Sequence, residues 1–157
     1  QFYLTTKLQY TYQTAIDVTD PNDTYYGDQI PYIPWHSGSV VGMFGWQNDW
    51  QQYGLNYSFI YVGERYNQQE NILYNYTQPW YTHDLSLFGE WDIPIKNYEL
   101  RMKNSTQDIQ NSKFKIQNYI TLRVALDVNN LLSQDYDVIL NYPMPKRNYK
   151  CTISITY

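Results

Sequence analysis

The last nine residues of the chain, YKCTISITY at 149–157, alternate strictly between apolar and polar side chains. Side chains in an extended strand point alternately to opposite faces. One face of this segment therefore receives Tyr149, Cys151, Ile153, Ile155 and Tyr157. Aliphatic side chains occupy its middle and an aromatic ring stands at each end, while Lys, Ser and Thr residues share the other face. The chain must therefore fold into a class that is built from strands with one apolar and one wet face.

Five further segments repeat the two-residue period. The sequence predicts strands near 2–14, 37–46, 52–62, 81–91, 119–131 and 148–157. The segment SGSVVGMFGW alternates only weakly, around Val41 and Met43, because three glycines interrupt it. No βαβ rhythm or internal repeat of about 20 to 50 residues is present. The predicted fold class is therefore all-β, with antiparallel up-and-down strands in which sequential neighbours pair.

The connections between these strands differ in length. Long polar loops rich in Asp, Asn and Pro are expected at 15–36, 63–80 and 132–147, whereas QNDW near 47–51 predicts a tight turn. Residues 92–118 keep neither a helical nor a strand period, although YELRM is compatible with a strand and STQD with a turn. The long loops are expected at one end of the sheet, because consecutive strands reverse direction.

Composition excludes several classes of protein. The net charge of −4 and the pI near 5.0 give no electrostatic reason to expect a nucleic acid partner. No stretch approaches the roughly 18 consecutive apolar residues of a membrane-spanning helix. The 19 tyrosines and five tryptophans make 18% of the chain aromatic, yet mean hydropathy is −0.64, so the apolar content resides in amphipathic rings. Such rings suit strands that meet both lipid and water.

Two all-β architectures remain. In a transmembrane β-barrel the apolar face meets lipid, and aromatic rings gather at the two membrane interfaces. The alternative is a soluble, aromatic-rich β-sandwich that binds glycans by stacking sugar rings on exposed aromatics, and in it a second sheet covers the apolar face. In a barrel, we expect the lipid-facing set to be Leu4, Leu8, Tyr10, Leu55, Tyr57, Phe59, Leu85, Leu87, Leu122, Val124, Leu126, Ile153 and Ile155.

The segment DVNNLLSQDYDVILNYPMPKRNYKCTISITY at 127–157 resembles the C-terminal end of TonB-dependent outer-membrane receptors. The likeness is to the vitamin-B12 and siderophore receptors of Bacteroidetes, and IPYIPWHSGS, LNYSFIYVGERY and WYTHDLSL resemble their barrel segments. The sequence departs from that pattern at Lys146, where the family has glycine, and in the length of 92–118.

The resemblance implies a bacterial outer-membrane protein that imports a scarce, bulky nutrient such as cobalamin, haem or a ferric siderophore. Family barrels have about 22 strands around a plug domain. Residues 1–157 would then be the C-terminal portion of a barrel, without the plug. The expected partners are membrane lipid, the rest of the barrel and plug, TonB through the missing N-terminal part, and a surface lipoprotein. Tyr157 matches the terminal aromatic residue that acts as an outer-membrane assembly signal.

The long loops then become the expected ligand-facing surface, because family receptors carry their long loops outside the cell. Large rings provide contact area at a low cost in conformational entropy. The aromatic candidates for ligand binding are Tyr25, Tyr26, Tyr32, Trp35, Tyr66, Tyr74, Tyr76, Trp80, Tyr136 and Tyr142.

Other candidate sites are weak. Asp17, Asp20, Asp23 and Asp28 place four carboxylates in one loop and form a possible Ca²⁺ site, but their spacing does not match the EF-hand and favours a solvated acidic loop. His36 and His83 are far apart in the sequence and each lies beside loop residues, so they are weak candidates for metal ligation. Glu64 and Arg65 are expected to form a surface ion pair or to contact ligand. No catalytic arrangement can be assembled, so neither an enzyme nor a cofactor is predicted.

Overall fold

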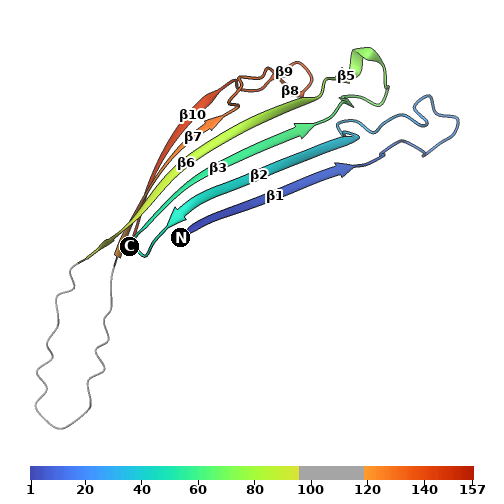
Figure 1. Ribbon diagram of the computed structural model, residues 1–157. Helices are drawn as coiled ribbons and strands as arrows, with labels where there is room; N and C mark the ends of the chain where they lie inside the picture. Colours follow the sequence, from blue (N-terminus) through green and yellow to red (C-terminus); the bar gives the residue numbers. More distant parts are fainter. Residues whose placement is uncertain (96–118) are drawn as a thin grey trace, which may run out of the picture.

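The computed structural model describes residues 1–95 and 119–157, and one six-stranded antiparallel sheet dominates it (Figure 1). Its strands are β1 (Phe2–Tyr12), β2 (His36–Gln47), β3 (Gln51–Val62), β6 (Trp80–Pro94), β7 (Tyr119–Asn129) and β10 (Asn148–Thr156). The strand order in the sheet follows the order in the sequence. The predicted up-and-down arrangement is thus confirmed, and every strand boundary lies within three residues of its expected position.

The smaller elements lie within the long loops. β4 (Arg65–Tyr66) pairs with β5 (Tyr76–Thr77), and β8 (Asp137–Ile139) pairs with β9 (Tyr142–Pro143). A single 3₁₀ turn, η1 (Leu73–Asn75), lies between β4 and β5. These pairs are too short to show a periodic sequence signal. The possible YELRM strand and STQD turn lie outside the described residues. Among the described residues, no helix is long and apolar enough to cross a membrane.

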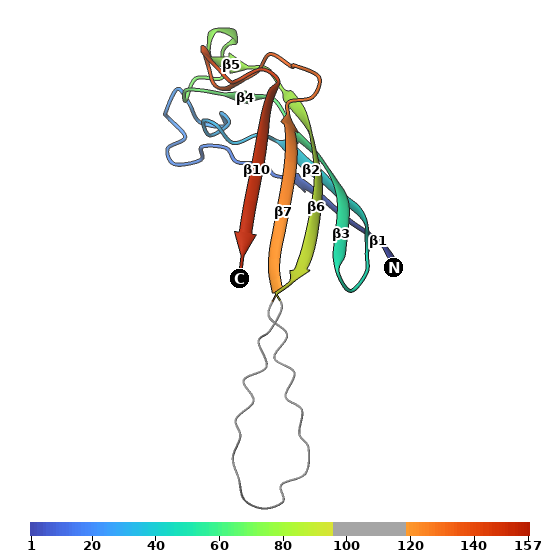
Figure 2. The same cartoon turned by 90° about the vertical axis from the view of Figure 1, so that its left-hand side faces the viewer.

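The sheet is twisted and open, with β1 and β10 as its two edges (Figures 1 and 2). The long loops leave from one end of the sheet, and the β2–β3 turn lies at the other. The Asn48 side chain makes this turn tight, because its Oδ1 accepts hydrogen bonds from the backbone of Trp50 at 2.9 Å and of Gln51 at 2.7 Å. The short turn and the long loops therefore lie at opposite ends, as the connection lengths predicted.

The register of the strands gathers the apolar side chains on one face. Leu4 pairs with Phe44, which pairs with Leu55, and the row continues through Leu87 and Leu126. All thirteen residues of the predicted lipid-facing set share this apolar face. Its large side chains are open to the surroundings, as shown by the exposed fractions of Leu8 at 75% and Leu4 at 72%.

Aromatic rings occupy both ends of the apolar face. Near the β2–β3 turn, Tyr53 lies between Trp46 and Trp91, with ring centroids 6.0 and 5.7 Å away, and accepts a hydrogen bond of 2.8 Å from Trp91 Nε1. Near the long loops, Phe59 and Tyr81 form a second aromatic group at 6.2 Å. Aliphatic side chains fill the strand centres between these groups, which is the layout of a barrel that spans a membrane.

The weak alternation of β2 around Val41 and Met43 lies on the polar face of the sheet. Met43 pairs with Thr5 and Asn56, so it belongs to the polar face of the sheet, and Val41 lies on that face too. Phe44 supplies the apolar contact instead, with its ring 6.2 Å from that of Phe2. Glycine leaves β2 with few large side chains, and the neighbouring strands therefore determine which side of β2 faces outward.

The polar face is covered locally by its own side chains. Phe88 points to this face and is only 5% exposed. Its ring lies against Gly54, where a Cβ atom would collide with it, and the Arg123 guanidinium lies 4.5 Å from its centroid. Arg123 also pairs with Glu90 at 3.2 Å. The Arg123 guanidinium thus covers a large ring that packs on this face.

The sandwich alternative does not fit this architecture. A sandwich requires a second sheet over the apolar face. Within residues 1–95 and 119–157, the two other sheets have two strands each and lie in the loops. The apolar face of the large sheet therefore has no protein layer over it in the described part of the chain.

A candidate ligand-facing surface made by three loops

Three long loops meet at one end of the sheet, and we name them loop 1 (13–35), loop 2 (63–79) and loop 3 (130–147) (Figures 1 and 2). The backbone N–H of Tyr32 in loop 1 donates to the carbonyl of Tyr66 in loop 2 at 2.7 Å. The backbone N–H of Asn71 donates to Asp28 Oδ2 at 3.2 Å. Loops 1 and 2 are therefore joined at two separate points.

Arg65 joins loop 2 to loop 3. Its Nη2 donates to the carbonyl oxygens of Asp137 at 2.7 Å and Val138 at 2.9 Å, and the residue is only 3% exposed. Burial lowers the pKa of the guanidinium, an effect that the nearby Tyr32 and Asp137 oppose. A buried cation held by backbone carbonyls ties the β8–β9 hairpin firmly to loop 2.

The prediction that Glu64 and Arg65 form a surface ion pair is wrong. The pairing of β4 with β5 turns Arg65 inward, whereas Glu64 remains exposed. Glu64 Oε2 accepts a hydrogen bond of 3.1 Å from the Tyr76 hydroxyl, and burial and this bond raise the pKa of Tyr76. Arg65 is thus a structural residue of the loops and offers no free cation to a ligand.

All ten candidate aromatic residues lie on the loops or at their junction with β6, but they form separate groups. The Tyr66 and Tyr76 rings pack edge to face at 5.9 Å, and the Trp80 and Tyr136 rings lie 4.6 Å apart. Four of the others have exposed side chains, namely Tyr26 at 48%, Tyr32 at 46%, Tyr74 at 84% and Tyr142 at 68%. Trp35 is half-buried, and its carbonyl accepts a hydrogen bond from the Gln13 backbone at 3.0 Å.

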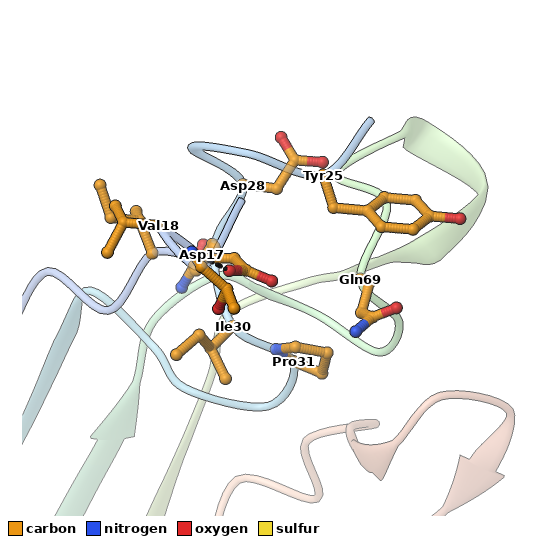
Figure 3. Close-up of a pocket in the computed structure, with 10 residues that line it drawn as sticks. Asp17, Val18, Tyr25, Asp28, Ile30, Pro31 and Gln69 are labelled. Atoms are coloured by element: carbon orange, nitrogen blue, oxygen red, sulfur yellow. Dashed lines mark hydrogen bonds between the residues drawn. The ribbon is translucent and has the colours of Figure 1, made fainter. Parts of the chain in front are cut away.

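The first cavity of the loop surface lies between loops 1 and 2. It has a volume of about 300 Å³, and Figure 3 shows Tyr25 and Gln69 on one side of it, with Asp17 and Val18 on the other. Tyr25 is the one ligand-binding candidate that lines this cavity. The cavity is small and is shared by two loops.

The second cavity lies between loops 2 and 3 and is larger, at about 510 Å³. Volumes of about 300 to 1,000 Å³ are usual for sites that hold small molecules. Three aromatic candidates, Tyr76, Trp80 and Tyr136, line it together with Thr77 and residues of the β8–β9 hairpin. We name it the loop 2–loop 3 cavity. It brings together candidates that are about 60 residues apart in the sequence.

The loop surface is acidic. The three loops carry eight acidic side chains against three basic ones, so their combined field repels anions. Asp17, Asp20 and Asp23 each accept a hydrogen bond from a backbone N–H two residues later, in the form of Asx turns. The bonds from Thr19 lower the pKa of Asp17. In the described ranges, no three His, Cys, Asp or Glu side chains are arranged to hold a metal ion.

The two histidines lie on the apolar face instead of in the loops. His36 Nδ1 is 2.7 Å from the Tyr10 hydroxyl, and His83 Nδ1 is 2.6 Å from the Tyr57 hydroxyl. Each histidine is paired with its own tyrosine, so the two do not converge on a shared site. Cys151 also lies on this face, opposite Leu126, as its alternation predicted.

Sequence reasoning missed Arg65, Thr77 and Asn75 as organising residues of the loops. Each is at most 3% exposed, although each occurs in a polar loop sequence. Asn75 Nδ2 donates to the Glu70 carbonyl at 2.9 Å. The Glu-Arg pair directly after a strand was the available signal, but the partners of Arg65 lie more than 70 residues away.

The family model for the TonB-dependent receptor-like β-barrel matches residues 1–131. A comparison with curated proteins gave no match. The matched range ends in loop 3, and β10 is added to the same sheet by nine residues of pairing with β7. Members of this family are outer-membrane transporters of bacteria and not enzymes. The chain, with its open up-and-down sheet and its apolar outer face, belongs to the TonB-dependent receptor β-barrel family.

Proposed function

We propose that the chain is the C-terminal part of an outer-membrane receptor that binds and imports a scarce, bulky nutrient such as cobalamin, haem or a ferric siderophore. Residues 1–157 supply part of the barrel wall and three loops outside the cell. The observation that carries this proposal is the loop surface, because hydrogen bonds from Tyr32 and Arg65 join three loops at one end of a barrel sheet. A joined surface can contact a large ligand at several points.

The two faces of the sheet have separate partners in this proposal. The apolar face contacts membrane lipid, and the polar face, with Glu90 and Arg123, faces the plug in the lumen. The free edges of β1 and β10 pair with the remainder of the barrel. TonB contacts the N-terminal part of the receptor, and a surface lipoprotein is a further partner over the loops. Tyr157 acts as the signal for outer-membrane assembly, and the receptor resembles the vitamin-B12 and siderophore receptors of Bacteroidetes in function.

The experiment replaces the tip of loop 2 in the full-length receptor. The backbone N–H of Asn67 donates to the Asn75 carbonyl at 2.9 Å, so the chain can be rejoined there. Exchanging residues 68–74 for Asn-Gly, a sequence suited to a two-residue hairpin, removes the exposed tip and spares β4 and β5. We expect weaker capture of the nutrient by cells and a normal amount of folded barrel in the outer membrane.

The orientation of the loops is tested separately. A Leu73→Cys variant in a Cys151→Ser background offers a single cysteine at a residue that is 88% exposed on loop 2. A membrane-impermeant thiol reagent should label it in intact cells. Absence of labelling in a receptor that is folded in the outer membrane would contradict the proposed position of loop 2 outside the cell.

A further inference from the structure

The chain's two histidines are held in the same way at two places on the apolar face. The first is His36, at the start of β2, which lies directly opposite Tyr12 of β1. The Tyr12 ring packs against the imidazole with the ring centroids 5.1 Å apart. Tyr10, two residues earlier on β1, places its hydroxyl 2.7 Å from His36 Nδ1. A Tyr-Thr-Tyr segment of one strand therefore fixes the imidazole of the next strand.

The second histidine, His83 of β6, repeats this arrangement with β3. Phe59 lies directly opposite His83 and packs against it at 4.9 Å, and the Tyr57 hydroxyl lies 2.6 Å from His83 Nδ1. When the hydroxyl donates to Nδ1, the neutral imidazole carries its proton on Nε2, and a protonated imidazole has an N–H there as well. Each histidine therefore keeps an N–H donor for a further partner at the ring nitrogen that its tyrosine does not occupy.

These histidines lie on a face that is otherwise uncharged. Within residues 1–95 and 119–157, the apolar face of the six strands carries no lysine, arginine, aspartate or glutamate. His36 and His83 are therefore its only described side chains that can carry a positive charge. An ionisable side chain at a lipid-facing surface is costly, and it is by default a candidate functional site. The partner of these imidazoles has to be sought in the membrane, because no protein layer covers the face in the described part of the chain.

The level of the histidines in the membrane follows from the spacing of the aromatic rings. On β6, Tyr81 precedes Trp91 by ten residues. On β2, His36 precedes Trp46 by the same number. A strand of about ten residues extends about 33 Å and, at a tilt of about 40°, rises about 25 Å, which is the height of the apolar band of an outer-membrane barrel. His83 lies two residues inside Tyr81. Both imidazoles therefore lie at the edge of the band on the side of the long loops, where lipid headgroups meet acyl chains.

A lipid phosphate is the group that suits this position. The imidazole N–H donates, and an anionic phosphate oxygen accepts a stronger hydrogen bond than a neutral oxygen does. Free phosphate from solution has to pass the three loops, whose eight acidic side chains outnumber three basic ones, so their field repels it. A lipid reaches the same position by diffusion in the plane of the membrane. The arrangement therefore favours a headgroup over a soluble anion.

We propose that His36 and His83 are two binding sites on the outer wall of the barrel for the phosphate group of a membrane lipid headgroup, each donating from Nε2. His36 is exposed and His83 is half-buried. β3 separates the strands that carry them, so each histidine binds its own lipid. This inference goes beyond the proposed import of a nutrient, because it concerns the lipid-facing wall. Its failure would leave the proposed role of the loops standing.

The first test compares the binding of two lipids to the full-length receptor by native mass spectrometry in detergent micelles. Phosphatidic acid offers an exposed phosphate monoester, whereas phosphatidylcholine with the same acyl chains carries a shielded phosphodiester. We expect phosphatidic acid to bind the native receptor about fivefold more tightly, and a receptor with both His36→Phe and His83→Phe to retain less than about half of this preference. Equal affinities for the two lipids, or an unchanged preference in the double variant, would overturn the proposal. Displacement of the lipid by inorganic phosphate at an equal concentration would overturn it as well, because the site would then belong to a soluble anion.

The second test separates the donor at Nε2 from the packing of the ring. His36→Gln places an amide N–H near the position of Nε2, whereas His36→Asn places one near the position of Nδ1. In a His83→Phe background, we expect the glutamine variant to keep the remaining preference for phosphatidic acid and the asparagine variant to lose about two- to threefold of it. Only receptor that keeps its compact form on an unheated gel is compared.

Trp46→Phe is the matched control, because it removes an N–H donor from the same strand and the same face at the other membrane interface. It should leave the preference for phosphatidic acid unchanged. Equal losses in His36→Gln and His36→Asn, or a loss in Trp46→Phe as large as that in His36→Asn, would overturn the assignment.

Discussion

Neighbouring residues on one strand differ in exposure according to the face of the sheet on which they lie. On β6, Leu87 is 55% exposed on the apolar face, whereas the next residue, Phe88, is 5% exposed on the polar face. Phe88 is packed against Gly54 and covered by Arg123, while Leu87 has only other apolar side chains beside it. At this pair of residues, the apolar face exposes its large side chain and the polar face buries one, which is the reverse of a strand in a soluble domain.

The largest effect should come from a charge on the apolar face. Val124 is the central residue of β7, so Val124→Arg should reduce the folding free energy of the full-length receptor in lipid by about 2 to 4 kcal/mol if that position lies near the bilayer midplane. Ala125→Arg places the same charge one residue later, on the polar face, and should cost less than about 1 kcal/mol. The measurement is denaturant titration of refolding into lipid vesicles. An equal loss of folding free energy in the two variants would contradict the assignment of one face to lipid and the other to the barrel interior.

A smaller effect is expected from filling the close contact on the polar face. Gly54→Val should collide with the Phe88 ring and destabilise the barrel by about 1 to 3 kcal/mol, as overpacked cores do. Gly42 is the matched position on the apolar face, where a Cβ atom would meet nothing within 4 Å. Gly42→Val should therefore be tolerated. The two variants are compared by heating the folded receptor and finding, on a gel, the temperature at which its compact form is lost. A lower temperature for Gly42→Val than for Gly54→Val would contradict the packing described here.

The smallest effect should come from the polar face's ion pair. Arg123→Met removes the 3.2 Å contact with Glu90 and the cation over Phe88, and both partners of the ion pair are partly exposed. Its expected cost is about 0.5 to 1 kcal/mol, and added salt should reduce the difference from the native receptor. Lys7→Met, at an exposed position of the same face, serves as the control. Salt-independent destabilisation by Arg123→Met would assign its role to packing alone.

Alternation made the sheet predictable from the sequence. β3 and β10 carry large apolar side chains at every second position, so both their boundaries and their outward faces followed from the two-residue period. β2 shows where the period fails. Its glycines leave Val41 and Met43 as the most visible apolar residues, and only pairing with Leu4 and Leu55 shows that Phe44 faces outward.

The loop surface was predictable in position but not in arrangement. The loops had to meet at one end because the strands alternate in direction, and their aromatic residues could be named. The burial of Arg65 and the pairing of Trp80 with Tyr136 depend on contacts between segments that are more than 50 residues apart. No local pattern encodes such contacts, since each loop alone reads as polar and irregular.

The central claim, that one face of the sheet meets lipid, is tested most directly by a spin-label scan along β7. Single cysteines from 120 to 128 in a Cys151→Ser receptor, reconstituted in lipid vesicles, report accessibility to oxygen and to a water-soluble nickel chelate. We predict high oxygen accessibility at Leu122, Val124 and Leu126, and low oxygen accessibility at Arg123, Ala125 and Asp127. A scan without the two-residue alternation, or with the two sets exchanged, would contradict the account.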